Sequence, residues 1–76
     1  MVIEILGTGC TKCKALEEAA HKAVEKIGGN HTVVKVEDIQ KIVGYGVLST
    51  PGLVVDGEVK STGKALSVDE IINIIK

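Results

Sequence analysis

The chain alternates two hydrophobic periodicities, and their order constrains the fold. Short apolar or β-branched runs, which are typical of strands, lie at residues 2–6, 32–37, 52–55 and 58–61. Apolar residues at helical spacing lie at residues 11–27, 39–43 and 68–75. The sequence therefore predicts the order β-α-β-α-β-β-α, an α/β fold with a four-stranded mixed sheet flanked by three helices.

Turn and cap signals separate these segments. Asp38 is a suitable N-cap for the short second helix, and Ser67 with Glu70 fits a capping box before the last one. Asp56-Gly57 between two strand-like runs predicts a hairpin. Because the first three strands alternate with helices, we expect them to pair in parallel, with the hairpin adding an antiparallel edge.

Length and composition limit the classes of protein. A chain of 76 residues supports a single domain, residues 1–76, and buries about 60% of the surface that its unfolded form exposes. The single aromatic residue, Tyr45, and the net charge of −1 argue against nucleic acid as a partner. No apolar run approaches the ~20 residues that span a bilayer, and Glu4 interrupts the apolar stretch at the start. We therefore expect no membrane partner and a cytoplasmic protein, in a compartment where thiols are normally kept reduced.

The two cysteines of the chain, Cys10 and Cys13, lie where the first strand leads into a helix. Cys10 is then near the free backbone N–H groups and the positive dipole end of that helix, and Lys12 and Lys14 add positive charge nearby. These features favour the thiolate, which is the attacking species in disulfide exchange. Cys13, one turn further, should be more buried. The pattern indicates that Cys10 is the nucleophile and that Cys13 resolves the mixed disulfide that Cys10 forms.

A cysteine pair has two other common uses, a structural disulfide and a metal site. A structural bridge between residues 10 and 13 closes a four-residue loop worth ~2 kcal/mol, whereas a bridge across a long loop is worth ~4 kcal/mol. A closed zinc site needs four ligands, and neither His21 nor His31 lies at a zinc-finger spacing from Cys13. We therefore expect no metal site closed within the chain. Two thiolates suit copper(I), so a non-enzymatic copper(I) or zinc carrier is the alternative function.

Two known families share parts of this pattern. The stretch GTGCTKCKAL resembles the GMTCxxC loop of heavy-metal-associated domains, which carry copper(I), but Thr8 replaces its methionine and the chain ends in a helix instead of a strand. CxxC after the first strand, Thr50-Pro51 before the third, the Asp-Gly hairpin and a glycine before the last helix together resemble the thioredoxin/glutaredoxin superfamily. Essentially all 76 residues resemble its small redox-active disulfide proteins, the mini-thioredoxins of archaea and bacteria.

The second resemblance implies a thiol–disulfide oxidoreductase that acts on disulfide-containing protein substrates and is served by a disulfide reductase. It implies no cofactor beyond a redox-active Cys10–Cys13 disulfide. Pro51 is implied as a cis-proline that faces the two sulfurs, and Thr50 as backbone on which a substrate segment pairs like an added strand. Gly63 is implied as the glycine that lets a partner approach.

The resemblance also assigns a candidate role to Glu4, six residues before Cys10. Thioredoxins have a buried aspartate at this offset, which assists proton transfer to the inner cysteine. Glu4 could do the same on a central strand, where burial would disfavour its charged form, or it could be solvated on an exposed strand. Between the cysteines, Thr11-Lys12 replaces the Gly-Pro that is usual in thioredoxins.

Overall fold

The computed structural model describes residues 1–75 and contains the predicted order of elements. The strands are β1 (Val2–Leu6), β2 (Thr32–Val36), β3 (Gly52–Val55) and β4 (Glu58–Thr62). The helices are α1 (Thr11–Ile27), α2 (Ile39–Gly44) and α3 (Val68–Ile75). The predicted fold class, an α/β fold with one four-stranded mixed sheet and three helices, is confirmed. Within residues 1–75 no helix combines the length and the apolar character needed to cross a membrane.

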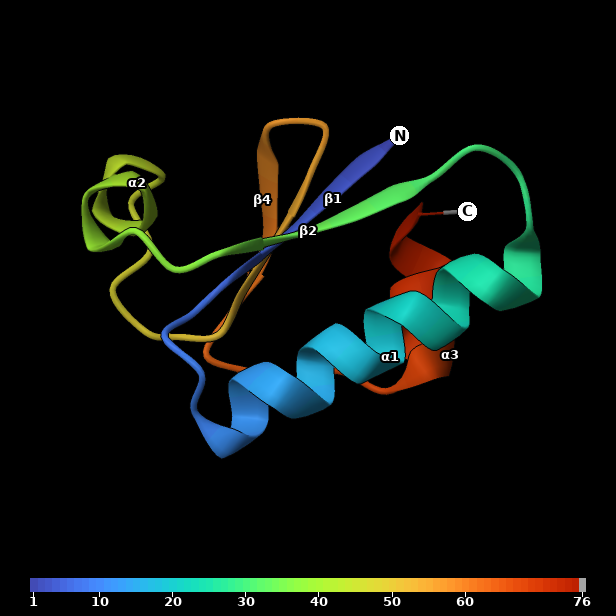
Figure 1. The fold of residues 1–76 in the computed structure, drawn as a ribbon, viewed down its shortest axis with the longest axis horizontal. Coiled ribbons are helices and arrows are strands. Elements are labelled where there is room, and N and C mark those ends of the chain that lie inside the picture. The colour runs from blue at the N-terminus through green and yellow to red at the C-terminus, as the bar shows by residue number, and fades with distance from the viewer. Residues whose placement is uncertain (76) are drawn as a thin grey trace.

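The strands lie in the order β2-β1-β3-β4 (Figure 1). β1 pairs with β2 in parallel, but β3 is antiparallel to both β1 and β4, so the expectation that β3 pairs in parallel was wrong. Gly52, which begins β3, pairs with Leu6, which ends β1, so the chain enters β3 at the end of the sheet where β1 and β2 finish. A parallel strand needs a connection that returns along the sheet. The 17 residues of α1 span about 25 Å and carry the chain back along the sheet before β2. The six residues of α2 span only about 9 Å, so the chain does not return before β3.

The two faces of the sheet are covered unequally. α1 and α3 lie together over one face and α2 lies on the other (Figure 1). Ile3 and Ile5 of β1 belong to the larger core, and Leu6 belongs to the smaller one beneath α2. The buried residues of the larger core are Ile3, Ile5, Leu16, Ala19, Ala20, Ala23, Leu53, Val55, Leu66, Ile71 and Ile75. Those of the smaller core are Leu6, Val36, Ile42, Val47 and Val54. The long helix that carries Cys13 is therefore fixed by the larger core.

Both predicted helix caps are present. Asp38 Oδ1 accepts a hydrogen bond from the N–H of Gln40 at 2.9 Å, which caps α2. The Ser67 N–H donates to Glu70 Oε1 at 3.0 Å, and the Glu70 N–H donates to Ser67 Oγ at 3.2 Å, which is the reciprocal pattern of a capping box. The hydrogen bond from the Ser67 backbone is the main reason that the pKa of the Glu70 carboxyl lies below its usual value.

The predicted hairpin joins β3 to β4 and also fastens the end of β3 to β1. Asp56 has φ +49° and Gly57 has φ +84°, which is the pair of left-handed residues that a tight two-residue hairpin requires. Asp56 further accepts a hydrogen bond from the Val2 N–H on its Oδ1 at 2.8 Å, and its own N–H donates to the Val2 carbonyl at 2.8 Å. Two hydrogen bonds to β1 thus hold the turn of the β3–β4 hairpin in place.

Candidate active site

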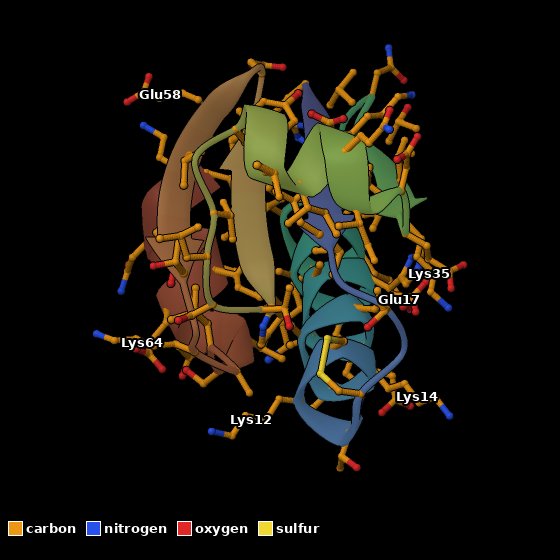
Figure 2. All side chains as sticks on the ribbon, turned by 90° about the vertical axis from the view of Figure 1, so that its left-hand side faces the viewer. Lys12, Lys14, Glu17, Lys35, Glu58 and Lys64 are labelled. Atoms are coloured by element: carbon orange, nitrogen blue, oxygen red, sulfur yellow. A yellow bond between two sulfur atoms is a disulfide. The ribbon has the colours of Figure 1, made fainter. Side chains whose placement is uncertain are left out.

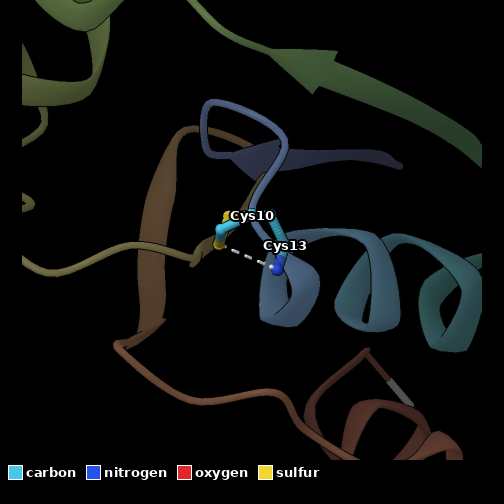
Figure 3. The surroundings of a disulfide bond; sticks show 2 residues. All are labelled: Cys10 and Cys13. Atoms are coloured by element: carbon cyan, nitrogen blue, oxygen red, sulfur yellow. Dashed lines mark hydrogen bonds between the residues drawn. A yellow bond between two sulfur atoms is a disulfide. The ribbon is translucent and has the colours of Figure 1, made fainter.

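Cys10 and Cys13 form a disulfide at the start of α1, with their Cα atoms 5.0 Å apart. Figure 3 shows the pair at the first turn of the helix. Cys10 is the N-cap: its backbone is extended, with φ −67° and ψ +166°, and its Sγ accepts a hydrogen bond from the Cys13 N–H at 3.2 Å. The sulfur of Cys10 therefore occupies the place that Ser or Asp oxygens usually take, at the positive end of the helix dipole.

The two cysteines differ in exposure as expected. Cys10 is exposed, whereas Cys13 retains only 4% of its accessible surface. Both are fixed by the strand-to-helix turn, because the Lys14 N–H donates to the Cys10 carbonyl at 3.0 Å as the first helical hydrogen bond. A partner that approaches this end of α1 meets Cys10 first.

Gly7 is a site residue that the sequence analysis missed. It is buried directly after β1, and its N–H donates to the Val36 carbonyl at 2.9 Å. A Cβ at this position would overlap the Sγ of Cys13 and lie 3.0 Å from its Cβ. Gly7 does not adopt a positive φ, so glycine is needed here for space and not for backbone freedom. The sequence signal is a glycine between the first strand and CxxC, which by itself does not distinguish a tight contact from a turn.

The segment that precedes β3 lies beside this turn. Its Thr50–Pro51 peptide bond is cis, and Pro51 is fully buried while Thr50 is exposed. The next residue, Gly52, pairs with Leu6, immediately before the turn that carries the cysteines. The Gly63 N–H donates to the Pro51 carbonyl at 2.8 Å, and Gly63 has φ +70°. The fold therefore gathers five of the six predicted site residues at one end of the sheet.

Glu4 lies elsewhere on the central strand. It is half-buried on the face that α2 covers, and its Oε2 accepts a hydrogen bond from the Tyr45 hydroxyl at 2.7 Å. The hydrogen bond and the negative charge of Glu4, together with partial burial, raise the pKa of Tyr45. Tyr45 itself packs against the smaller core. The sequence contained no local signal for this pair, whose members are 41 residues apart.

The histidines considered as metal ligands do not join the cysteines. Among residues 1–75 there is no cluster of three or more His, Cys, Asp or Glu side chains that could hold a metal ion. His21 lies eight residues after Cys13, about 12 Å further along α1, and its Nε2 is 3.9 Å from Glu17 Oε2. His21 thus lies beside the Glu17 carboxylate on the exposed face of α1, and not beside the cysteines.

A CxxC disulfide at the N-cap of the helix that follows the first strand, in a four-stranded mixed sheet with three helices, is typical of redox proteins with a thioredoxin fold. The thioredoxin domain family model matches residues 1–76. A thioredoxin of Methanothermobacter thermautotrophicus is 40% identical over 75 residues, which cover 99% of this chain and 97% of that protein. A thioredoxin of Methanocaldococcus jannaschii is 42% identical over 76 residues, which cover 100% of this chain and 87% of that protein.

The chain therefore belongs to the thioredoxin family. It is a thiol–disulfide oxidoreductase, with the disulfide at Cys10 and Cys13 as its redox centre. Members of this family act on disulfide substrates and are reduced by a reductase. These matches favour the redox interpretation over the metal carrier that the same two sulfurs allowed.

Proposed function

We propose that the chain reduces disulfides of cytoplasmic proteins, that Cys10 is the attacking cysteine, and that Cys13 is the resolving one. The observation that carries this assignment is the asymmetry of the two residues. Cys10 is exposed and its sulfur accepts a helix N–H, whereas Cys13 is 4% exposed. Hydrogen bonding to a helix N-terminus stabilises a negative sulfur, and only an accessible thiolate can attack a partner.

The proposed reaction transfers two electrons to the partner in two exchanges. The Cys10 thiolate attacks one sulfur of the partner disulfide, that S–S bond breaks, and the other partner sulfur leaves as a thiolate. Cys13 then loses its proton and attacks the Cys10 sulfur, which releases the second partner thiolate and forms the Cys10–Cys13 disulfide. A disulfide reductase returns two electrons and no further cofactor is needed. Help from Glu4 in accepting the Cys13 proton stays a prediction, and in the structure the Glu4 carboxylate is half-buried and accepts a hydrogen bond from Tyr45.

The proposal includes a substrate path along the segment before β3. Thr50 would offer backbone groups to an extended substrate segment, in the manner of an added strand, while Pro51 shapes the segment and Gly63 leaves room. The exposure of Thr50, the burial of Pro51 and the hydrogen bond between the Gly63 N–H and the Pro51 carbonyl support this path.

A selective alkylation experiment tests the assignment of the nucleophile. When reduced protein is treated with less than one equivalent of iodoacetamide at pH 7, we expect Cys10 to be modified at least about tenfold faster than Cys13, because it is more exposed and its thiolate is better stabilised. Peptide mass spectrometry locates the label. In guanidinium chloride, where the helix is lost, the two cysteines should react at similar rates. Equal labelling of the folded protein, or faster labelling of Cys13, would contradict the assignment.

Leu48 tests the substrate path. It is 89% exposed, more than any other large hydrophobic residue among residues 1–75, and it lies two residues before Thr50. If a substrate covers it, the substitution Leu48→Ser should raise the KM for a protein disulfide about fivefold, which corresponds to ~1 kcal/mol, with kcat unchanged. The free energy of unfolding should not change, since the side chain packs against little in the free protein. Steady-state kinetics and urea titration measure these quantities.

The matched control for Leu48 is Ile39, which is 65% exposed on α2. Ile39→Ser should leave the KM unchanged, because Ile39 belongs to α2, nine residues before Leu48 and outside the segment that carries Thr50. A small aromatic disulfide, too short to reach Leu48 while it reacts at Cys10, should be reduced by the Leu48→Ser variant at the rate of the unmodified protein. An unchanged KM for the protein disulfide would rule out contact between Leu48 and the substrate.

A further inference from the structure

Three of the nine lysines of the chain lie in the segments around the disulfide. Three segments meet at this end of the sheet, at residues 7–16, 48–52 and 61–66, and they contain Lys12, Lys14 and Lys64. None of the ten acidic residues of the chain lies in these segments, although the net charge of the whole chain is −1. Figure 2 shows the three lysines at the same end of the molecule as the disulfide. Glu17, one turn after Cys13 on α1, also lies near the disulfide, and its Oε2 is 3.9 Å from His21 Nε2. A positive end therefore stands out on an otherwise acidic protein.

These lysines are available to a partner. All three are exposed, and the ion pairs found within residues 1–75 involve other cations, namely His21, Lys35 and Lys60. The first turn of α1 has no acidic residue, so the positive end of the helix dipole adds to the same field. Glu70 is an acidic neighbour of Lys64, because the positive charge of Lys64 contributes to the lowered pKa of the Glu70 carboxyl. That carboxylate is already bonded to the Ser67 N–H.

We propose that Lys12, Lys14 and Lys64 form a docking surface for protein disulfides that are flanked by carboxylates. This inference rests on the proposed function, because the partner must bring its disulfide to the Cys10 sulfur. Side chains next to that disulfide then lie at the same end of the molecule as the lysines, and charges at 0.1 M salt act over ~10 Å. Opposite charges raise the rate of encounter and orient the partner. The acidic remainder of the surface repels such a partner and so adds to the orientation.

The experiment compares two peptides that contain the same intramolecular disulfide and differ only in their flanking residues, glutamates in one and lysines in the other. The second-order rate constant for reduction by the reduced protein is measured for each, at 0.05 M and at 0.5 M salt. The ratio of the acidic to the basic rate constant should fall about tenfold between these salt concentrations, because salt screens the docking charges.

Charge reversal at Lys64 isolates the docking effect, since Lys64 lies outside CxxC. In the Lys64→Glu variant the low-salt ratio should fall about fivefold. Carboxylates also change the intrinsic reactivity of a disulfide, and a variant can shift the potential of the cysteine pair. The intrinsic reactivity of each peptide is the same for every protein variant. A shift in the potential of the cysteine pair changes the rate constants of both peptides alike. Neither effect therefore changes how the ratio of the acidic to the basic rate constant differs between variants.

Lys26→Glu is the matched control. It makes the same change of charge on an exposed residue of α1, 13 residues and about 20 Å along the helix from Cys13. Its ratio should stay within twofold of that of the unmodified protein. Equal ratios for the unmodified protein and Lys64→Glu would overturn the docking inference and leave the proposed function intact. Failure of the unmodified protein to reduce either peptide would overturn both.

Discussion

Replacing Cys10 by serine should abolish the reduction of protein disulfides to the uncatalysed background, whereas replacing Cys13 by serine should stop the reaction halfway. Without the Cys10 sulfur there is no exposed thiolate at the helix N-terminus, and Cys13 is only 4% exposed. Without Cys13 the first exchange still proceeds, but nothing attacks the Cys10 sulfur to release the partner. We therefore expect Cys13→Ser to accumulate about one equivalent of mixed disulfide, seen by intact mass spectrometry and reversed by dithiothreitol.

Both serine variants should remain folded, which makes the comparison interpretable. The bridge between Cys10 and Cys13 closes a loop of four residues, so its loss costs only ~2 kcal/mol of the free energy of unfolding. Urea titration of each variant against the oxidised unmodified protein measures this cost, and against the reduced protein each variant should show little change. The double variant should form no mixed disulfide. A mixed disulfide that forms through Cys13 in the Cys10→Ser variant would reverse the assignment of roles.

Local sequence signals predicted the elements of the fold well, and long-range placement was harder to predict. The Asp56-Gly57 hairpin and the Ser67–Glu70 capping box depend on residues within one turn, and both are present. The direction of β3 depends on where the chain re-enters the sheet after α2. Alternation of strands with helices is the usual sign of parallel pairing, but it contains no information on whether a connection returns along the sheet. The connection through the short α2 does not return along the sheet, so β3 runs antiparallel to β1.

The same distinction applies to the site. Cys10 and Cys13 could be predicted because a helix N-terminus is a local feature that changes the chemistry of a cysteine. The hydrogen bond between Tyr45 and Glu4 joins residues 41 apart, on α2's side of the sheet, and no periodicity or motif encodes it. The need for glycine at position 7 arises from a single packing contact with Cys13, which becomes visible only in three dimensions.

That contact leads to the second large expected effect, from Gly7→Ala. The added methyl group would overlap the Sγ of Cys13, and either the sulfur or the turn after β1 must shift. Because Gly7 and Cys13 are both buried, there is little room for either shift. Overpacking of this kind typically costs about 1–3 kcal/mol, which for a chain of this size lowers Tm by roughly 4–8 °C per kcal/mol. Urea and thermal unfolding should show this loss in both the oxidised and the reduced protein.

The substitution should also slow the second exchange, because the displaced sulfur is the one that must attack Cys10. Mixed disulfide should then accumulate during turnover, although both cysteines are present. Gly44→Ala is the matched control: a Cβ there meets nothing within 4 Å, and alanine is favoured over glycine in a helix by ~0.5–1 kcal/mol. That variant should be at least as stable as the unmodified protein and equally active. If Gly7→Ala were as stable and as fast as Gly44→Ala, the contact between Gly7 and the Cys13 sulfur would have no part in holding the redox centre.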